Sequence, residues 1–165
     1  MADVEFKDFR IQVKGALGNL AEQAVEECCG ELESQTKRNT VVGRVAGGQL
    51  KNNWGHHVST NGDVTTGTVG NPLERSIWYE FGTGEYALNN NGRSGGWYIP
   101  IGGGEKEISE AVVKAYGFKV VEGKDGKKYA HTYGMKPRRP FWKAYSALKN
   151  KLIKHIQDVF KGGMQ

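Results

Sequence analysis

Two apolar stripes with helical spacing, one near each end of the chain, constrain its fold more than any other feature. The first stripe lies between about Val4 and Thr36, with apolar residues at steps of three and four: Phe6, Phe9, Val13, Leu17, Leu20, Ala24, Cys28 and Leu32. The second lies between Pro140 and Lys161: Phe141, Tyr145, Leu148, Leu152, Ile156 and Phe160. Proline suits the first position of a helix, and Gly162 follows the second stripe as a stop. The stripes predict two terminal amphipathic helices.

Two hairpin signals lie between the predicted helices. Asn61-Gly62 and Asp125-Gly126 are turn dipeptides that accept the positive φ angles of tight hairpin turns. Each is flanked by β-branched or aromatic runs, 57–60 with 63–69 and 118–121 with 129–133. We therefore predict an α+β fold, in which two hairpins build an antiparallel sheet and both terminal helices pack on one of its faces.

The 165 residues are enough for one compact core, so we predict a single domain over residues 1–165. The spacing of Leu73, Ile77 and Phe81 predicts a helical turn that ends at Gly82. Asn and Gly are concentrated at 84–104, which predicts a long mobile loop that contains a short strand near 97–101.

Charge is distributed unevenly along the chain. Residues 3–33 carry eight acidic and three basic side chains, a net charge of −5, whereas residues 136–161 carry eight basic side chains and Asp158, a net charge of +7. Such segments can attract each other within one molecule or between neighbouring copies. Contact of the basic segment with nucleic acid is the rival interpretation.

The sequence indicates a reducing compartment. Cys28 and Cys29 are adjacent in a predicted helix, where their side chains diverge and cannot form a relaxed disulfide with each other. The beginning of the sequence lacks a basic segment followed by an apolar run, and no stretch is apolar enough to span a membrane. We expect a protein made and kept in a cytosol, with no membrane contact.

Catalytic and metal-binding interpretations of the sequence are weak. His56 and His57 are adjacent on a predicted strand and so point to opposite faces, which does not suit a shared metal ion. Cys28 lies on the apolar face of a predicted helix, as a buried structural cysteine does. Glu80 could be a general acid, but pairing with an arginine, for example Arg138 or Arg139, is the more probable role. We expect no enzyme activity, cofactor or metal.

Aromatic residues are concentrated near glycine turns and element ends, where they suit protein interfaces. They are Trp54, Trp78, Tyr79, Phe81, Trp97, Tyr98, Phe141 and Trp142. We expect some of them to be core residues and the others to be interface anchors.

Four motifs, in this order, resemble the tail-completion or neck proteins of tailed bacteriophages. They are Leu-Lys-Asn-Asn-Trp at 50–54, Val-Gly-Asn at 69–71, Trp-Tyr-Glu-Phe-Gly-Thr-Gly at 78–84, and Pro-Arg-Arg-Pro-Phe at 137–141. The resemblance covers about residues 1–160, and Glu-Phe-Gly-Thr-Gly together with Arg-Pro-Phe is its most specific part. Two features depart from the family: Asn53 replaces a common serine, and 84–132 is a long additional segment.

The resemblance implies a structural protein of the virion, made in the bacterial host cytoplasm. Copies would form a ring, expected to be a hexamer, between a head-connector or head-closure protein and a tail terminator or tail tube protein. DNA contact is compatible with this role but not required. The expected interface residues are Trp54, Trp78, Tyr79, Glu80, Phe81, Gly82, Thr83, Gly84, Arg138, Arg139, Pro140 and Phe141.

Two other functions remain as alternatives to the structural role. The basic last helix, with Lys143, Lys149 and Lys154, suits a nucleic-acid-binding accessory protein. A small cytosolic enzyme that uses Glu80 or His131 would require a concave site with a perturbed carboxylate or imidazole.

Overall fold

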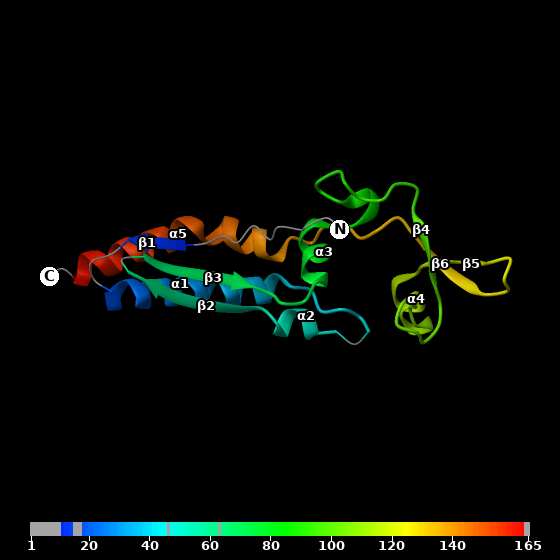
Figure 1. Ribbon diagram of the computed structural model, residues 1–165, viewed down its shortest axis with the longest axis horizontal. Coiled ribbons are helices and arrows are strands. Elements are labelled where there is room, and N and C mark those ends of the chain that lie inside the picture. The colour runs from blue at the N-terminus through cyan, green and yellow to red at the C-terminus, as the bar shows by residue number, and fades with distance from the viewer. Residues whose placement is uncertain (1–10, 15–17, 46, 63, 164–165) are drawn as a thin grey trace. The chain divides into compact units, whose positions relative to one another are not determined.

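The computed structural model describes residues 11–14, 18–45, 47–62 and 64–163 (Figure 1). The chain divides into two compact units. Unit 1 comprises Met1–Val41, Leu50–Ser76 and Arg139–Gln165, and unit 2 comprises Val42–Gln49 and Ile77–Arg138. The interpretation of the whole chain as a single domain stays a prediction, and each unit is described by itself below.

Unit 1 contains a three-stranded antiparallel sheet with the order β1-β3-β2. Its strands are β1 (Ile11–Lys14), β2 (Gly55–Asn61) and β3 (Val64–Gly70). The predicted first hairpin is confirmed: Asn61 pairs with Val64 across the turn, and Gly62 has a φ of +58°. This positive angle is one that glycine adopts readily, which is why Asn-Gly forms the turn here.

Helix α1 (Gly18–Asn39) packs on this sheet with its small and apolar face. The buried residues of α1 are Ala21, Ala24, Val25, Cys28, Cys29, Leu32 and Thr36. Gly67 of β3 allows this close packing, because a Cβ at Gly67 would lie 2.3 Å from the sulfur of Cys29 and 2.6 Å from Cγ1 of Val25. A side chain on residue 67 would therefore push α1 away from the sheet.

The predicted start of the first helix near Val4 is wrong for Ile11–Lys14, which form strand β1. Apolar and polar residues alternate at these positions, and this strand pattern coincides with the helical spacing of Phe9 and Val13. Pairing with β3 then decides in favour of the strand. The other residues of the predicted early turns, 4–10 and 15–17, lie outside the described part of the chain.

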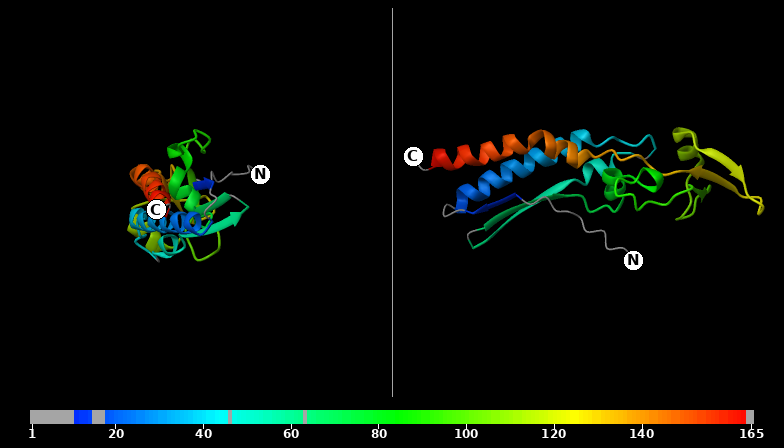
Figure 2. Two further views of the ribbon diagram at one scale, coloured as in Figure 1. Left: turned by 90° about the vertical axis from the view of Figure 1, so that its left-hand side faces the viewer. Right: turned by 90° about the horizontal axis from the view of Figure 1, so that it is seen from above.

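The C-terminal helix α5 (Pro140–Gly163) packs against α1, as Figure 2 shows. It begins at Pro140 as predicted, but it continues through Gly162, the predicted stop. Phe141, Ala144 and Leu152 of α5 are buried in the core of unit 1. Ahead of β2 lies a short helix, α2 (Gln49–Asn52), which leads to Trp54. The ring of Trp54 stacks on that of Phe141, with 6.1 Å between the ring centroids.

Unit 2 contains a second three-stranded antiparallel sheet, with the order β4-β6-β5. Its strands are β4 (Trp97–Pro100), β5 (Lys119–Glu122) and β6 (Lys128–Thr132), which confirms the second hairpin and the short strand predicted near 97–101. The predicted α+β class is therefore confirmed, but the two hairpins do not share the one sheet that was predicted: each pairs with a further strand in a sheet of its own.

Along the chain, two helical segments lie between β3 and β4, and a third lies between β4 and β5. Helix α3 (Arg75–Phe81) begins just before the unit and is the predicted turn that ends at Gly82, and η1 (Gly84–Tyr86) is a short 3-10 helix. Helix α4 (Glu110–Tyr116) was not predicted. Its signals were Ser109, whose hydroxyl accepts a hydrogen bond from Val112 N, and Gly117, which ends it with a φ of +67°.

Candidate functional site: a paired loop in unit 2

The Gly-Thr-Gly motif and the segment before the last helix lie side by side in unit 2. The backbone N–H of Thr83 donates to the carbonyl of Met135 at 2.9 Å, and Met135 N donates back to the Thr83 hydroxyl at 2.9 Å. Glu85 N donates to the carbonyl of Tyr133 at 2.9 Å, and Arg138 N donates to that of Tyr79 at 2.8 Å. We call residues 79–85 with 133–138 the paired loop.

Glycines make the paired loop this tight. Gly82, Gly84 and Gly134 have φ angles of +75°, +61° and +111°. A Cβ would lie 2.8 Å from the Met135 carbonyl oxygen at Gly82, 2.2 Å from that of Tyr133 at Gly84, and 2.0 Å from that of Thr83 at Gly134. A side chain is therefore excluded at each position for two reasons: the backbone angle is one that other residues rarely adopt, and the site of the Cβ lies too close to another atom. These glycines fix one segment of this chain against another.

The paired loop holds apolar side chains at the surface. Trp78 is 47% exposed, and Tyr86 and Leu88 are exposed beside the motif. Leu88 N donates to the carbonyl of Phe81 at 2.9 Å, and the ammonium of Lys136 lies 5.5 Å from the centroid of the Tyr86 ring. Tyr86 and Leu88 were missed by sequence reasoning, which concentrated on motif positions. Their signal was an apolar residue on either side of Ala87 in a segment otherwise rich in Asn and Gly.

The predicted interface residues of unit 2 differ in accessibility. Trp78 and Arg138 are exposed, Tyr79, Phe81 and Thr83 are half-buried, and Glu80, Gly82 and Gly84 are buried. The pairing of Glu80 with Arg138 or Arg139 stays a prediction.

Three other predicted interface residues are core residues of unit 1. Pro140 and Phe141 are buried, and Trp54 is only 4% exposed. The indole N–H of Trp54 donates to the hydroxyl of Thr40 at 3.0 Å, so both its ring and its polar atom are used inside the unit. These three side chains are therefore not accessible to a partner of the folded unit.

Arg139 lies at the start of α5 in an uncommon backbone conformation, with a φ of +53°. Its guanidinium carbon is 4.8 Å from the centroid of the Trp142 ring, and its carbonyl accepts a hydrogen bond from Lys143 N at 3.1 Å. Its place is thus at the first turn of the helix, where it contacts an aromatic ring of the same helix.

Two of the sequence motifs, those at 50–54 and 69–71, meet in unit 1. The side-chain amide of Asn71 donates to the carbonyl of Leu50 at 2.8 Å, and its oxygen accepts from Leu73 N at 3.0 Å. Asn71 is buried, so these bonds satisfy a polar group in the interior. The Leu-Lys-Asn-Asn-Trp and Val-Gly-Asn motifs thus support each other structurally.

The acidic and basic segments attract each other within one molecule. Lys151 of α5 pairs with Glu31 of α1 at 2.5 Å, and His155 Nε2 lies 2.6 Å from a carboxylate oxygen of Glu27. A lysine–carboxylate ion pair and a histidine–carboxylate contact thus lie along the seam between the two helices. Because these pairs are largely exposed, they help to set the register of the helices more than they add to stability.

A histidine between two carboxylates joins β2 to α1. His56 Nε2 lies 2.8 Å from Glu26 Oε1, and His56 Nδ1 contacts Glu33. Partial burial opposes protonation of His56, but the hydrogen bonds to the two carboxylates outweigh it and raise the pKa of the imidazole above its ordinary value. Among the described residues, no group of three or more His, Cys, Asp or Glu side chains could hold a metal ion.

The two cysteines are not in the reactive thiolate form. Both are buried, and burial raises the pKa of the Cys28 and Cys29 thiols to about 11. Both are therefore protonated at neutral pH, whereas a nucleophilic cysteine reacts as its thiolate. The Cys28 thiol lies 3.6 Å from the carbonyl oxygen of Leu152, to which it donates a weak hydrogen bond.

No family model, curated protein or solved structure matches this chain. Within the described residues, no helix is both long enough and apolar enough to cross a membrane.

Proposed function

We propose that this chain is a structural protein of a tailed phage particle, which assembles as a ring at the head–tail junction and has no catalytic role. The proposal rests on where the hydrophobic residues of unit 2 lie: the large ones that the structure describes are exposed or half-buried. Within the described part of unit 2, Ala130 is the only hydrophobic residue that is buried, whereas eight large hydrophobic residues are exposed. They are Val42, Trp78, Tyr86, Leu88, Tyr98, Tyr116, Val120 and Tyr133.

A unit with this surface gains more from burial against a partner than from burial inside itself. Aromatic side chains at such positions are the usual anchors of protein interfaces, because each buries a large area with few rotatable bonds. The paired loop supports this use: its backbone hydrogen bonds and its glycines hold Trp78 and Tyr86 in place before any partner arrives. Less conformational entropy is then lost on association.

The proposed ring requires a contact between two different surfaces of neighbouring subunits. When one surface of a subunit binds a different surface of the next, repetition of the contact closes a ring if the rotation is suitable. We propose that the exposed residues around the paired loop, with Trp78 at the centre, form one of these surfaces. The partners of the ring are a head-connector or head-closure protein on one side and a tail terminator or tail tube protein on the other.

The proposal is tested by complementation in phage that lack the gene. Trp78→Ala removes an exposed indole, so we expect folded protein but few joined particles, with filled heads and free tails accumulating. Trp142→Ala is the matched control, because it removes an exposed indole from unit 1. Normal infectivity with Trp78→Ala, or an equal loss with both variants, would count against this surface.

A further inference from the structure

The sheet of unit 2 has two unlike faces. Residues paired across antiparallel strands lie on the same face. Tyr98 of β4 pairs with His131 of β6, which pairs in turn with Lys119 of β5. Pro100, Tyr129 and Val121 form the next row. We call these six residues, together with the adjacent Tyr133, the tyrosine face.

The opposite face is covered only in part, since Ala130 on it is buried but Val120 is 45% exposed. Its central row joins Ile99, Ala130 and Val120, and Ala130 is 0% exposed. A shallow hollow of about 240 Å³ lies on this side, with Val113 and Lys114 of α4 among its lining residues. Val113 of α4 and Val120 of β5 both line this hollow, so α4 lies beside this face of the sheet.

The tyrosine face is open and its rings contact one another. Tyr98 is 60% exposed and Tyr133 is 48% exposed. The ring centroids of Tyr98 and His131 are 4.8 Å apart, and those of His131 and Tyr133 are also 4.8 Å apart, with an edge-to-face angle of 86°. Three aromatic rings thus form a continuous row in which the two outer rings are open to solvent.

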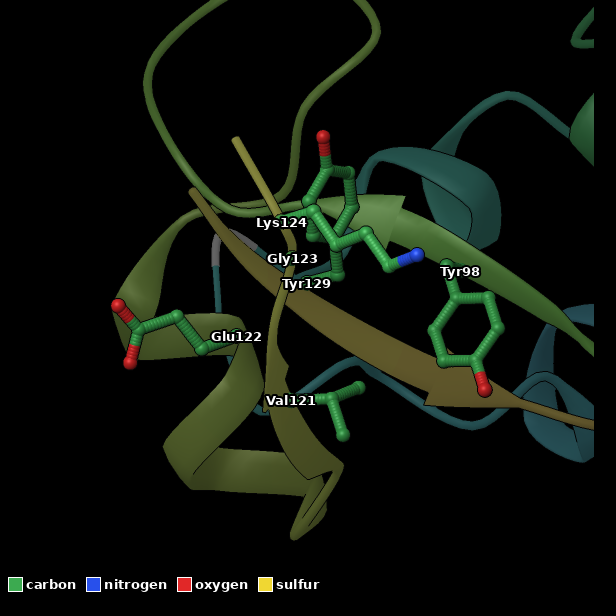
Figure 3. A pocket seen from close by; sticks show the side chains of 6 residues that line it. All are labelled: Tyr98, Val121, Glu122, Gly123, Lys124 and Tyr129. Carbon is green, nitrogen blue, oxygen red and sulfur yellow. The ribbon is translucent and has the colours of Figure 1, made fainter. Parts of the chain in front are cut away.

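A hollow of about 560 Å³ extends this row towards the β5–β6 turn. Tyr98, Val121 and Tyr129 give it apolar walls. In Figure 3 the side chain of Lys124 runs across the hollow towards Tyr98, whereas the carboxylate of Glu122 points away from it. A flat aromatic ligand group could lie here beside a positive charge.

The tyrosine face itself carries a positive charge, because Lys119 lies on it and none of its seven residues is acidic. Its hollow is lined by one residue of each charge, Lys124 and Glu122, and the carboxylate of Glu122 points away from the hollow. The nearby Asp125 is already engaged: it accepts hydrogen bonds from the Tyr129 hydroxyl at 2.7 Å and from Lys127 N at 3.1 Å. The bond from Tyr129 is the main reason why the pKa of Asp125 is lowered.

We infer that the tyrosine face binds single-stranded nucleic acid. Exposed rings on a sheet are stacking platforms for unpaired bases, and adjacent lysines neutralise the phosphates between them. A duplex hides the faces of its bases, so it could use the lysines but not the rings. The ammonium groups of Lys119 and Lys124, with the carboxylate of Glu122 turned away, favour a polyanion over a protein partner. This binding activity goes beyond the structural role proposed above.

The test is fluorescence anisotropy with the full-length protein and a labelled oligothymidylate of about 15 nucleotides. We expect binding at low salt that weakens about sevenfold for a fourfold rise in salt, which corresponds to about two phosphates neutralised. A duplex of the same length should bind more weakly. Tyr98→Ala should weaken binding of the single strand about tenfold, and Tyr98→Phe, which keeps the ring, should not.

Matched controls locate the site. Tyr116→Ala and Lys114→Ala alter a comparably exposed tyrosine and a lysine of α4, away from the tyrosine face, and should leave affinity unchanged. Lys119→Ala should weaken binding. No binding at low salt, equal affinity for duplex, or a loss with Lys154→Ala on α5 in place of Tyr98→Ala would overturn the inference. Self-association that Tyr98→Ala abolishes, without oligonucleotide binding, would likewise overturn it and assign the face to a protein contact.

Discussion

Among single residues, the glycines of the paired loop have the most direct structural consequence. Gly84 combines a φ of +61° with a carbonyl oxygen 2.2 Å from the position of a Cβ, so replacement affects both backbone conformation and packing. Gly95 has a similar φ of +79°, but no atom lies within 4 Å of its Cβ position. Comparing an alanine substitution at Gly84 with one at Gly95 therefore separates the free-energy cost of the backbone angle from that of the steric collision.

We expect Gly84→Ala to destabilise unit 2 by about 2–5 kcal/mol, the sum of the costs of a left-handed alanine and of an overpacked contact. Gly95→Ala should cost only about 1–2 kcal/mol, for the backbone angle alone. Hydrogen exchange of the amides of Thr83, Glu85 and Met135 measures the difference, because these amides donate the bonds of the paired loop. Equal protection in the two variants would show that the collision is relieved at no cost.

His56 predicts a pH dependence of stability. Since its pKa in the folded protein is raised, the stabilisation that it contributes is complete below its unfolded pKa of about 6.5 and is lost as pH rises through the folded value. Glu33 has the opposite effect. Partial burial raises the pKa of its carboxyl group, but the hydrogen bonds from Lys37 and His56 outweigh burial and lower it. The stabilisation that Glu33 contributes is therefore lost as the pH falls below its unfolded pKa of about 4.3 and through the folded value.

The free energy of unfolding should therefore fall as the pH rises above about 6.5 in the unmodified protein. Urea titrations across this range measure it. His56→Ala should flatten the dependence, whereas His57→Ala, an exposed neighbour on the same strand, should preserve it. An unchanged slope in His56→Ala would show that another group titrates.

Among the elements, the contact of α1 with β3 depends on Gly67. Replacement by alanine brings a methyl group onto Cys29 and Val25 without requiring an unusual backbone angle, and such overpacking typically costs about 1–3 kcal/mol. Gly70→Ala on the same strand is the control, since no atom lies within 4 Å of its Cβ position. Thermal unfolding should show a large loss for Gly67→Ala and little change for Gly70→Ala.

Removal of the opposing sulfur tests the cause. Combining Gly67→Ala with Cys29→Ala should recover part of the lost stability, because the nearest of the two colliding atoms is gone. Strictly additive effects of the two substitutions would mean that the collision is not the reason for the loss.

Elements with a strong local signal could be predicted from the sequence. The two hairpins and α5 follow from turn dipeptides and a long apolar period, both of which act over short distances. Strand β1 was assigned to the wrong class because its alternating residues also fit a helical spacing, and only pairing with β3 distinguishes the two. Helix α4 is short and has no buried residue, so its caps were its only signal.

The candidate site was predictable in part. The glycines and Trp78 could be found, because Gly-Thr-Gly after an aromatic cluster is unusual in itself. The sequence could not predict which aromatic residues are buried and which are accessible, because burial depends on long-range packing. Trp54, for example, stacks on Phe141, which lies 87 residues later in the chain. The tyrosine face was likewise hidden, since its residues come from three separate strands.

At the scale of the whole molecule, the two units differ in how they use apolar residues. Unit 1 has a core of ten buried residues, built from α1, α5, β3 and Trp54. In the described part of unit 2, eight large hydrophobic residues are exposed and Ala130 is the only hydrophobic residue that is buried. We expect unit 1 to supply most of the stability of the free chain, and the exposed hydrophobic residues around the paired loop of unit 2, Trp78 and Tyr86 among them, to be buried against its neighbours in an assembly.

Cryo-electron microscopy of intact particles, with and without the gene, tests the central claim most directly. The account predicts a closed ring of this chain at the head–tail junction, with Trp78 and Tyr86 buried between subunits or against a neighbouring protein, and the loss of this ring when the gene is deleted. A particle in which the chain is absent, or in which it is present with unit 2 exposed to solvent, would contradict the account.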